Sequence, residues 1–259
     1  MPPTSFFINN NNDSQKALHL AHVAVIGGLH LAPISSDARI LDVGTGSGIW
    51  SIEMARSMPN SKVVGIDIIN PPPYPNQPSN CLFTVCDATK RFPFPDHAFS
   101  FIHVCYFSLA VHRGKWKKFL EECRRITCPG GWIEIHATDY QYHRTGGSGR
   151  MVNWNSQMLL GKMNDAGYTQ IQRQVYTHPL GSWSGPVGSV LRDCCKIRLN
   201  NLLVPVARFF LSPDRIIELE NCITEMVEEA NDMRSYYHSY TYVAQIPEDE
   251  AVEGIGITF

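Results

Sequence analysis

The chain has 259 residues, of which 44% are apolar, so it can bury the core of one large domain or of one domain with a cap. The formal net charge of -2 at pH 7 argues against a nucleic-acid partner or a strongly anionic membrane partner. The eight cysteines form no C-x-x-C pair, and no signal peptide or membrane-spanning apolar run is present, so the expected location is cytoplasmic.

The N-terminal segment predicts a helix that begins at Ser14. Leu18, Val25 and Leu29 recur at helical spacing and make one apolar stripe, which His22 flanks. Two interpretations of His22 stay open. In the first, the histidine lies at the edge of a packed helix. In the second, the helix covers a cofactor cleft and His22 faces substrate.

The stretch Arg39–Trp50, RILDVGTGSGIW, predicts a strand, a glycine turn and the start of a helix. This is the first βα unit of a doubly wound sheet, where ligands bind at the carboxyl ends of the strands. Gly44, Gly46 and Gly48 allow backbone angles that other residues avoid, and Asp42 is placed to meet a ligand ammonium. The spacing differs from the G-x-G-x-x-G of nicotinamide and flavin binders. A nucleoside-type cofactor is the favoured ligand.

Acidic residues end the next two predicted strands. Asp67 follows Lys62–Ile66 and can accept hydrogen bonds from both ribose hydroxyls, whereas Asp87 follows Cys81–Cys86 and could bind an exocyclic purine amine. Several prolines between residues 71 and 78 predict that the helix between these strands is short or missing. Cys105 and Tyr106 should line the site, because they end the fourth strand, Phe99–Tyr106.

The rest of the chain completes an alternating α/β pattern and then adds a helical region. The apolar residues of the two helices after residue 190 indicate that they cap the sheet or form a dimer face. The expected elements are a helix over Lys115–Ile126, a turn at Pro129–Gly131, a strand over Trp132–Ala137, a glycine-rich loop over Arg144–Arg150, a helix over Trp154–Ala166, a strand over Tyr168–Val175, helices over Val190–Phe210 and Ser212–Tyr237, and a strand over Tyr240–Ile246.

Together these segments resemble a class I S-adenosylmethionine-dependent methyltransferase, and most closely the LaeA-like group of fungal secondary metabolism. The resemblance rests on ILDVGTGSGIW with Asp67, on CDATKRFPFPDHAFSFIHV, on CPGGWIEI and on AGY…HPLGSW. It implies a Rossmann-like, doubly wound α/β fold with a seven-stranded sheet and one methyltransferase domain over residues 1–259. The implied parts are an N-terminal helical cap (14–36), a cofactor-binding core (37–180), a helical lid insertion (186–237), and a last strand with a tail (238–259).

The resemblance also implies S-adenosyl-L-methionine as cofactor and S-adenosyl-L-homocysteine as its product. Gly44, Gly46 and Gly48 would cradle the methionine moiety, Asp67 would hold the ribose and Asp87 would bind the adenine amine. The chain departs from the family at Cys86, where an acid is common, and at Cys105, where an arginine is common. The full predicted cofactor set is Asp42, Gly44, Thr45, Gly46, Gly48, Asp67, Ile68, Asp87, Ala88 and Cys105.

Methyl transfer depends on alignment of the acceptor with the methyl group and sulfur, and a general base is needed only for a protonated acceptor. His136 is the first candidate because it follows a strand end, with His22 and His112 as alternatives, and Tyr106 could orient the acceptor. A structural or solvated role for these histidines is an equal alternative. No metal-ligand cluster stands out in the sequence.

Three functions remain open at this point. The leading one is O- or N-methylation of a small natural product, with no nucleic-acid or membrane partner and with a homodimer formed through the helical lid. The second is a regulatory protein that works through protein partners. The third is a scaffold that uses bound cofactor for a non-methylating reaction.

Overall fold

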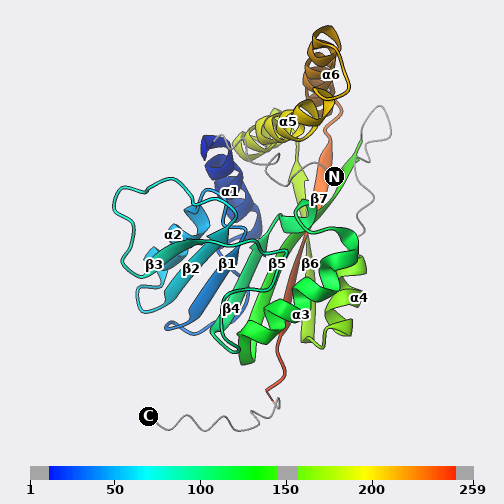
Figure 1. Ribbon diagram of the computed structural model, residues 1–259. Helices are drawn as coiled ribbons and strands as arrows, with labels where there is room; N and C mark the ends of the chain where they lie inside the picture. The colour runs from blue at the N-terminus through cyan, green and yellow to red at the C-terminus, as the bar shows by residue number, and fades with distance from the viewer. Residues whose placement is uncertain (1–11, 145–156, 249–259) are drawn as a thin grey trace, which may run out of the picture.

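A central sheet of seven strands organises the computed structural model, which describes residues 12–144 and 157–248. The strand order is β3-β2-β1-β4-β5-β7-β6 (Figure 1). Strand β7 runs opposite to all the other strands, so its pairings with β5 and β6 are antiparallel and the remaining pairings are parallel. This arrangement confirms the predicted doubly wound fold. The strands are β1 (Arg39–Val43), β2 (Lys62–Asp67), β3 (Cys81–Val85), β4 (Phe99–Cys105), β5 (Thr127–His143), β6 (Thr169–Pro179) and β7 (Tyr236–Gln245).

Helices cover both faces of the sheet and one of its ends. The helices are α1 (Asn12–Ile26), α2 (Ile49–Ser57), α3 (Trp116–Ile126), α4 (Gln157–Asp165), α5 (Pro186–Ala207) and α6 (Pro213–Asp232).

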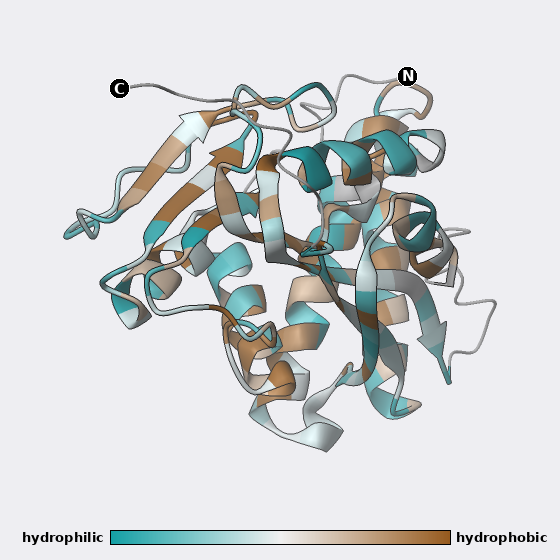
Figure 2. Cartoon of the chain, turned by 90° about the horizontal axis from the view of Figure 1, so that it is seen from below, coloured by the Kyte–Doolittle hydropathy of each residue, from teal (hydrophilic) through white to brown (hydrophobic). Residues whose placement is uncertain are grey.

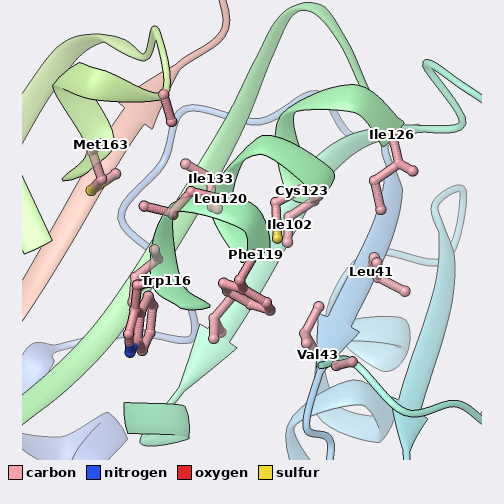
Figure 3. Close-up of a cluster of buried hydrophobic side chains, with 14 of the residues drawn as sticks. Leu41, Val43, Ile102, Trp116, Phe119, Leu120, Cys123, Ile126, Ile133 and Met163 are labelled. Atoms are coloured by element: carbon pink, nitrogen blue, oxygen red, sulfur yellow. The ribbon is translucent and has the colours of Figure 1, made fainter. Parts of the chain in front are cut away.

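Helix α3 supplies the apolar layer on one face. Trp116, Leu120 and Ile126 are fully buried, and the close-up in Figure 3 draws them in one cluster with the strand residues Leu41 and Ile102. Each such side chain contributes about 1.5–3 kcal/mol of burial free energy. The charged residues of α3 face solvent, as its helical periodicity predicts.

Helix α2 packs on the other face, where Ile52 and Met54 are buried in one cluster with Ile40 and Phe101. In Figure 2 the central strands are largely hydrophobic, which agrees with a sheet covered on both sides. The proline-rich segment between β2 and β3 contains no helix, as predicted. The edge strand β3 consequently leaves Leu82 63% exposed.

Helices α5 and α6 lie between β6 and β7 in the chain, as expected for a lid insertion, and Figure 1 shows them beyond one end of the sheet. They share a buried cluster with α1, in which Ala21 packs with Leu191, Leu199 and Ile223. The N-terminal helix and the lid therefore form one packed unit.

Several predicted boundaries were wrong. Helix α5 begins at Pro186 rather than Val190, because Pro suits the first turn of a helix. The end of the last predicted helix is strand instead, since Tyr236 pairs with His143 and with Pro179. Strand β6 pairs with this part of β7 and therefore ends at Pro179 rather than at the predicted Val175.

The predicted turn at Pro129–Gly131 lies inside β5. There the pairing with β4 shifts between Phe99 and Phe101, and Gly130 has a φ of +73°. Most of the predicted loop Arg144–Arg150 and the first residues of the helix Trp154–Ala166 lie outside the described residues. Within 12–144 and 157–248, no helix combines the length and apolarity that a bilayer crossing needs.

Candidate active site

The glycine turn after β1 has a backbone that only glycine adopts easily. Gly44, Gly46 and Gly48 have φ angles of +74°, +56° and +79°. A Cβ atom at Gly44 would lie 2.6 Å from the ring of Phe107, and one at Gly48 would lie 2.7 Å from the ring of Phe83. The two outer glycines are therefore required by close packing as well as by their backbone angles.

A cavity of about 400 Å³ lies beside this turn. Its walls come from the turn, from the residues that end β2, β3 and β4, and from helices α1 and α5. The size falls within the range of small-molecule and cofactor sites. The predicted site residues that line it are His22, Asp42, Gly44, Thr45, Gly46, Asp67, Ile68, Asp87, Ala88, Cys105 and Tyr106.

Gly48 and His136 are not part of this lining. Gly48 packs against Phe83 and Pro71, so it fixes the start of α2 behind the turn. Gly46 does line the cavity, and a Cβ there would lie 3.1 Å from Oε1 of Gln15 in α1. A bare backbone at this position leaves room for the methionine moiety of the cofactor, and the site thus fits the ligand that the sequence implies.

Asp42 has polar partners on both carboxylate oxygens. Oδ2 accepts hydrogen bonds from the hydroxyl groups of Thr45 and Ser51, each at 2.7 Å, and Oδ1 lies 2.8 Å from Nδ1 of His103. The imidazole of His103 in turn stacks on Trp50, with 3.7 Å between ring centroids. Asp42 therefore joins β1, the turn, α2 and β4, while one side of it lines the cavity.

Asp67 faces the glycine turn directly. Its Oδ2 accepts the N–H of Gly46 at 2.9 Å, and its Oδ1 accepts the N–H of Ile68 at 2.8 Å. Burial raises the pKa of Asp67 above its usual value, although these backbone hydrogen bonds oppose the increase. Asp87 follows β3 by two residues and accepts two hydrogen bonds from Thr89. Both acids line the cavity.

His22 and Tyr106 meet across the cavity wall. Nδ1 of His22 lies 2.9 Å from the phenolic oxygen of Tyr106, and the side chain is only 4% exposed. Its Nε2 has no hydrogen-bond partner among the described residues. Burial, followed by the charges of His136 and His178, places the pKa of His22 well below its usual value. At neutral pH this imidazole is uncharged.

The structure places His136 behind His22. Its Nε2 lies 2.8 Å from Oε1 of Glu134, and its Nδ1 lies 2.9 Å from the hydroxyl of Thr241. The His136 and His22 rings meet edge to face at 4.8 Å between centroids. Oε2 of Glu134 accepts the backbone N–H groups of Leu31 and Ala32, both at 2.8 Å. His136 thus belongs to a buried network that anchors the segment after α1.

His112, the third candidate base, lies outside the cavity lining. It is exposed, and its Nδ1 accepts the N–H of Gly114 at 3.2 Å. It caps a short helical turn before α3. This local hydrogen bond accounts for its position.

The cavity residues that were missed in the sequence include His103, Tyr142 and Arg198. A polar residue within the apolar strand FSFIHVC was a signal for His103, and an arginine between the apolar residues Ile197 and Leu199 was a signal for Arg198. Arg198 lies over the ring of Tyr106, with 5.4 Å between its Cζ and the ring centroid. Within residues 12–144 and 157–248, no three His, Cys, Asp or Glu side chains are grouped as a metal-ligand set.

Comparison with known proteins identifies a methyltransferase domain within the chain and supports the fold. Residues 40–131 match the methyltransferase domain family. The chain is 24% identical over 249 residues to methyltransferase pytC of Aspergillus terreus, an alignment that covers 85% of this chain and 75% of the relative.

It is also 28% identical over 180 residues to the secondary metabolism regulator laeA of Aspergillus fumigatus, covering 61% of this chain and 48% of the relative. The chain thus spans about half the length of that regulator. Among solved structures, phosphoethanolamine N-methyltransferase 2 of Haemonchus contortus, bound to phosphomonomethylethanolamine and S-adenosylhomocysteine, superimposes with a TM-score of 0.52 at 13% identity. That superposition covers 93% of this chain and 59% of the other, and it supports the fold.

Proposed function

We propose that this chain is a class I S-adenosylmethionine-dependent methyltransferase of the LaeA-like group and that it methylates a small natural product. The supporting observation is the cavity of about 400 Å³, which continues from the glycine turn to the polar groups under α1 and α5. One end suits the methyl donor. The other end, with His22 and Tyr106, offers room and hydrogen-bonding groups for an acceptor.

S-adenosylmethionine is the methyl donor, and when bound it supplies a methyl group on a positively charged sulfur. Gly44 and Gly46 would present bare backbone to its methionine moiety. Asp67 would accept the ribose hydroxyls, and Asp87 would accept the adenine amine. All four residues line the cavity.

His22 replaces His136 as the residue that we assign to proton transfer. Nδ1 of His22 lies within hydrogen-bonding distance of the Tyr106 oxygen. In the tautomer in which Nδ1–H donates to that oxygen, Nε2 keeps its lone pair. Nε2 can then accept the proton that an acceptor hydroxyl loses, and O-methylation is the favoured reaction.

The test is methyl transfer from labelled S-adenosylmethionine to a metabolite extract of the source organism. We expect label in a small molecule, and we expect no such label with Gly46→Val, which should not bind the cofactor. Label only on protein would favour the regulatory function that the laeA relative's name suggests. Cofactor binding with no label in either fraction would favour the non-methylating scaffold.

We also infer that the lid mediates a homodimer. The turn between α5 and α6 exposes three consecutive apolar residues, Phe209, Phe210 and Leu211, and Phe210 is 82% exposed. Large exposed apolar groups in a row are typical of protein interfaces. Light scattering should give the mass of a dimer for the wild-type chain and of a monomer for Phe210→Glu; a monomeric wild type would contradict this inference.

A further inference from the structure

One face of helix α1 forms a roof over the cavity. The residues of this face that line the cavity include Gln15, Leu18, His19 and His22, which recur at intervals of three and four and so lie on the same side of the helix. His22 is at the acceptor end of the cavity. Gln15 lies two helical turns earlier, about 10 Å along the helix axis, because each residue adds about 1.5 Å. The same helix therefore reaches both ends of the cavity.

The side-chain amide of Gln15 borders the glycine turn. A Cβ atom added at Gly46 would lie 3.1 Å from Oε1 of Gln15 and 3.6 Å from its Nε2. The Gln15 side chain is half-buried, and no described residue is hydrogen-bonded to its amide. This amide thus lies beside the bare backbone at which we place the methionine moiety of the methyl donor.

The backbone N–H groups at the start of the turn are already used within the protein. Those of Gly44 and Thr45 both donate to the carbonyl oxygen of Ile66, at 2.8 and 3.0 Å. The N–H of Gly46 donates to Oδ2 of Asp67 at 2.9 Å. An anionic group of the ligand that lies over this part of the turn therefore needs a hydrogen-bond donor from another segment.

The methyl donor brings such an anionic group. Its methionine moiety carries an ammonium and a carboxylate, whereas the cavity beside the turn is lined by the carboxylates of Asp42, Asp67 and Asp87. These acids attract the ammonium and the sulfonium but repel the carboxylate of the donor. The amide of Gln15 is uncharged and has two N–H donors, so it can bind a carboxylate without adding to this repulsion.

We propose that the side-chain amide of Gln15 binds the α-carboxylate of S-adenosylmethionine. This inference rests on the proposed function, which names that compound as the methyl donor, and it adds a binding residue from outside the matched domain of residues 40–131. Helix α1 then contacts the donor through Gln15 and the acceptor through His22. The helical cap is part of the donor site as well as of the acceptor site.

The experiment compares two donors that differ only in this carboxylate. Decarboxylated S-adenosylmethionine keeps the adenosine, the sulfonium and the ammonium, so it can make every donor contact except the one proposed here. The Kd of each compound for the full chain is measured by calorimetric titration, and no acceptor is needed. We expect the wild type to bind S-adenosylmethionine at least about tenfold more tightly than the decarboxylated compound, as a hydrogen bond to a charged group predicts.

Variants of α1 assign the difference to Gln15. Gln15→Ala should weaken S-adenosylmethionine about tenfold and leave the Kd of the decarboxylated compound unchanged, which also shows that the variant is folded. Gln15→Glu has nearly the same shape and should weaken S-adenosylmethionine further, because like charges repel, without weakening the decarboxylated compound. Leu20→Ala is the matched control, since Leu20 is 58% exposed on the same helix and does not line the cavity.

The remaining outcomes separate this inference from the proposed function. An unchanged Kd for S-adenosylmethionine in Gln15→Ala would overturn the inference and leave the methyltransferase function in place. Equal losses for the two donors would overturn it as well, because Gln15 would then act on a part of the donor that both compounds share. Failure of the wild type to bind either donor would overturn the donor site of the proposed function itself.

Discussion

The imidazole of His22 and the phenol of Tyr106 are joined by a 2.9 Å hydrogen bond that connects helix α1 to the end of β4. The bond brings together residues 84 positions apart in the chain. It fixes the imidazole at the cavity wall, and it explains why the N-terminal helix is part of the active site.

Replacing His22 with Gln should reduce kcat without affecting the methyl donor. General-base catalysis contributes about 10²–10⁴-fold to such reactions, so we expect a loss in that range. Tyr106→Phe should cause a smaller loss, because the imidazole remains but its tautomer is no longer fixed. The measurement is the initial rate with saturating cofactor, accompanied by calorimetric binding of S-adenosylhomocysteine. His112→Gln, which changes an exposed histidine outside the cavity, should retain wild-type activity; a normal rate in His22→Gln would exclude it as the base.

Asp67→Ala should weaken cofactor binding. The predicted two-bond contact with the ribose is worth on the order of 2–3 kcal/mol, since hydrogen bonds to charged groups contribute about 1.5 kcal/mol or more each. Calorimetric titration with S-adenosylmethionine and S-adenosylhomocysteine measures the change. Asp37→Ala removes an exposed carboxylate away from the cavity and should bind like wild type. Equal affinities in both variants would show that Asp67 does not hold the ribose.

Gly46→Val should abolish cofactor binding. The substitution places a branched side chain at a φ of +56° and at the cavity surface, 3.1 Å from Gln15. Gly161→Val is the matched control, because a Cβ at that position in α4 meets nothing within 4 Å. We expect the control to fold and to bind the cofactor normally. Normal binding by folded Gly46→Val would mean that the turn does not contact the ligand.

The free energy of unfolding should fall as the pH drops below about 6.5. His178 is buried with a pKa of about 4, for which burial and then the charges of Arg198, His238 and His136 are responsible. An unfolded histidine titrates near pH 6.5, so the unfolded state takes up the proton first. At pH 5.5 this costs about 1.4 kcal/mol from His178 alone. His22 and His136, whose pKa values are also lowered, add to the loss.

Urea unfolding at pH 7.5, 6.5 and 5.5 measures this slope. His178→Gln should make the slope shallower by the equivalent of one proton. A stability that is the same at all three pH values would contradict the assignment of neutral buried histidines.

The cofactor half of the site could be predicted from the sequence, because its parts follow local rules. The glycine turn follows an apolar strand, and acids follow at successive strand ends, so these parts lie close together in the chain. Parallel pairing then brings Asp42 beside Gly65, which is two residues before Asp67. The acceptor half could not be predicted in this way. His22, Tyr142 and Arg198 come from distant segments, and only the packing of α1 against α5 brings them together.

The choice of His136 as first candidate base illustrates the same limit. The prediction placed His136 at the end of a strand, but β5 continues to His143, so His136 lies within the strand and its side chain enters the layer behind the cavity. Glu134 and Thr241 hold the imidazole in that layer. The alternation of β5 could not reveal this, because the partner Thr241 lies 105 residues away.

The two halves of the cavity also differ in how freely they can change through evolution. Apart from Gln15, the residues assigned to the methyl donor fall within the matched methyltransferase domain, whereas His22, Tyr142 and Arg198 lie before or after it. Substitutions near His22 and in the lid can therefore alter which acceptor is accepted while the donor site stays intact. New substrate preferences can arise in such a chain through substitutions before and after the matched domain, while the domain itself stays unchanged.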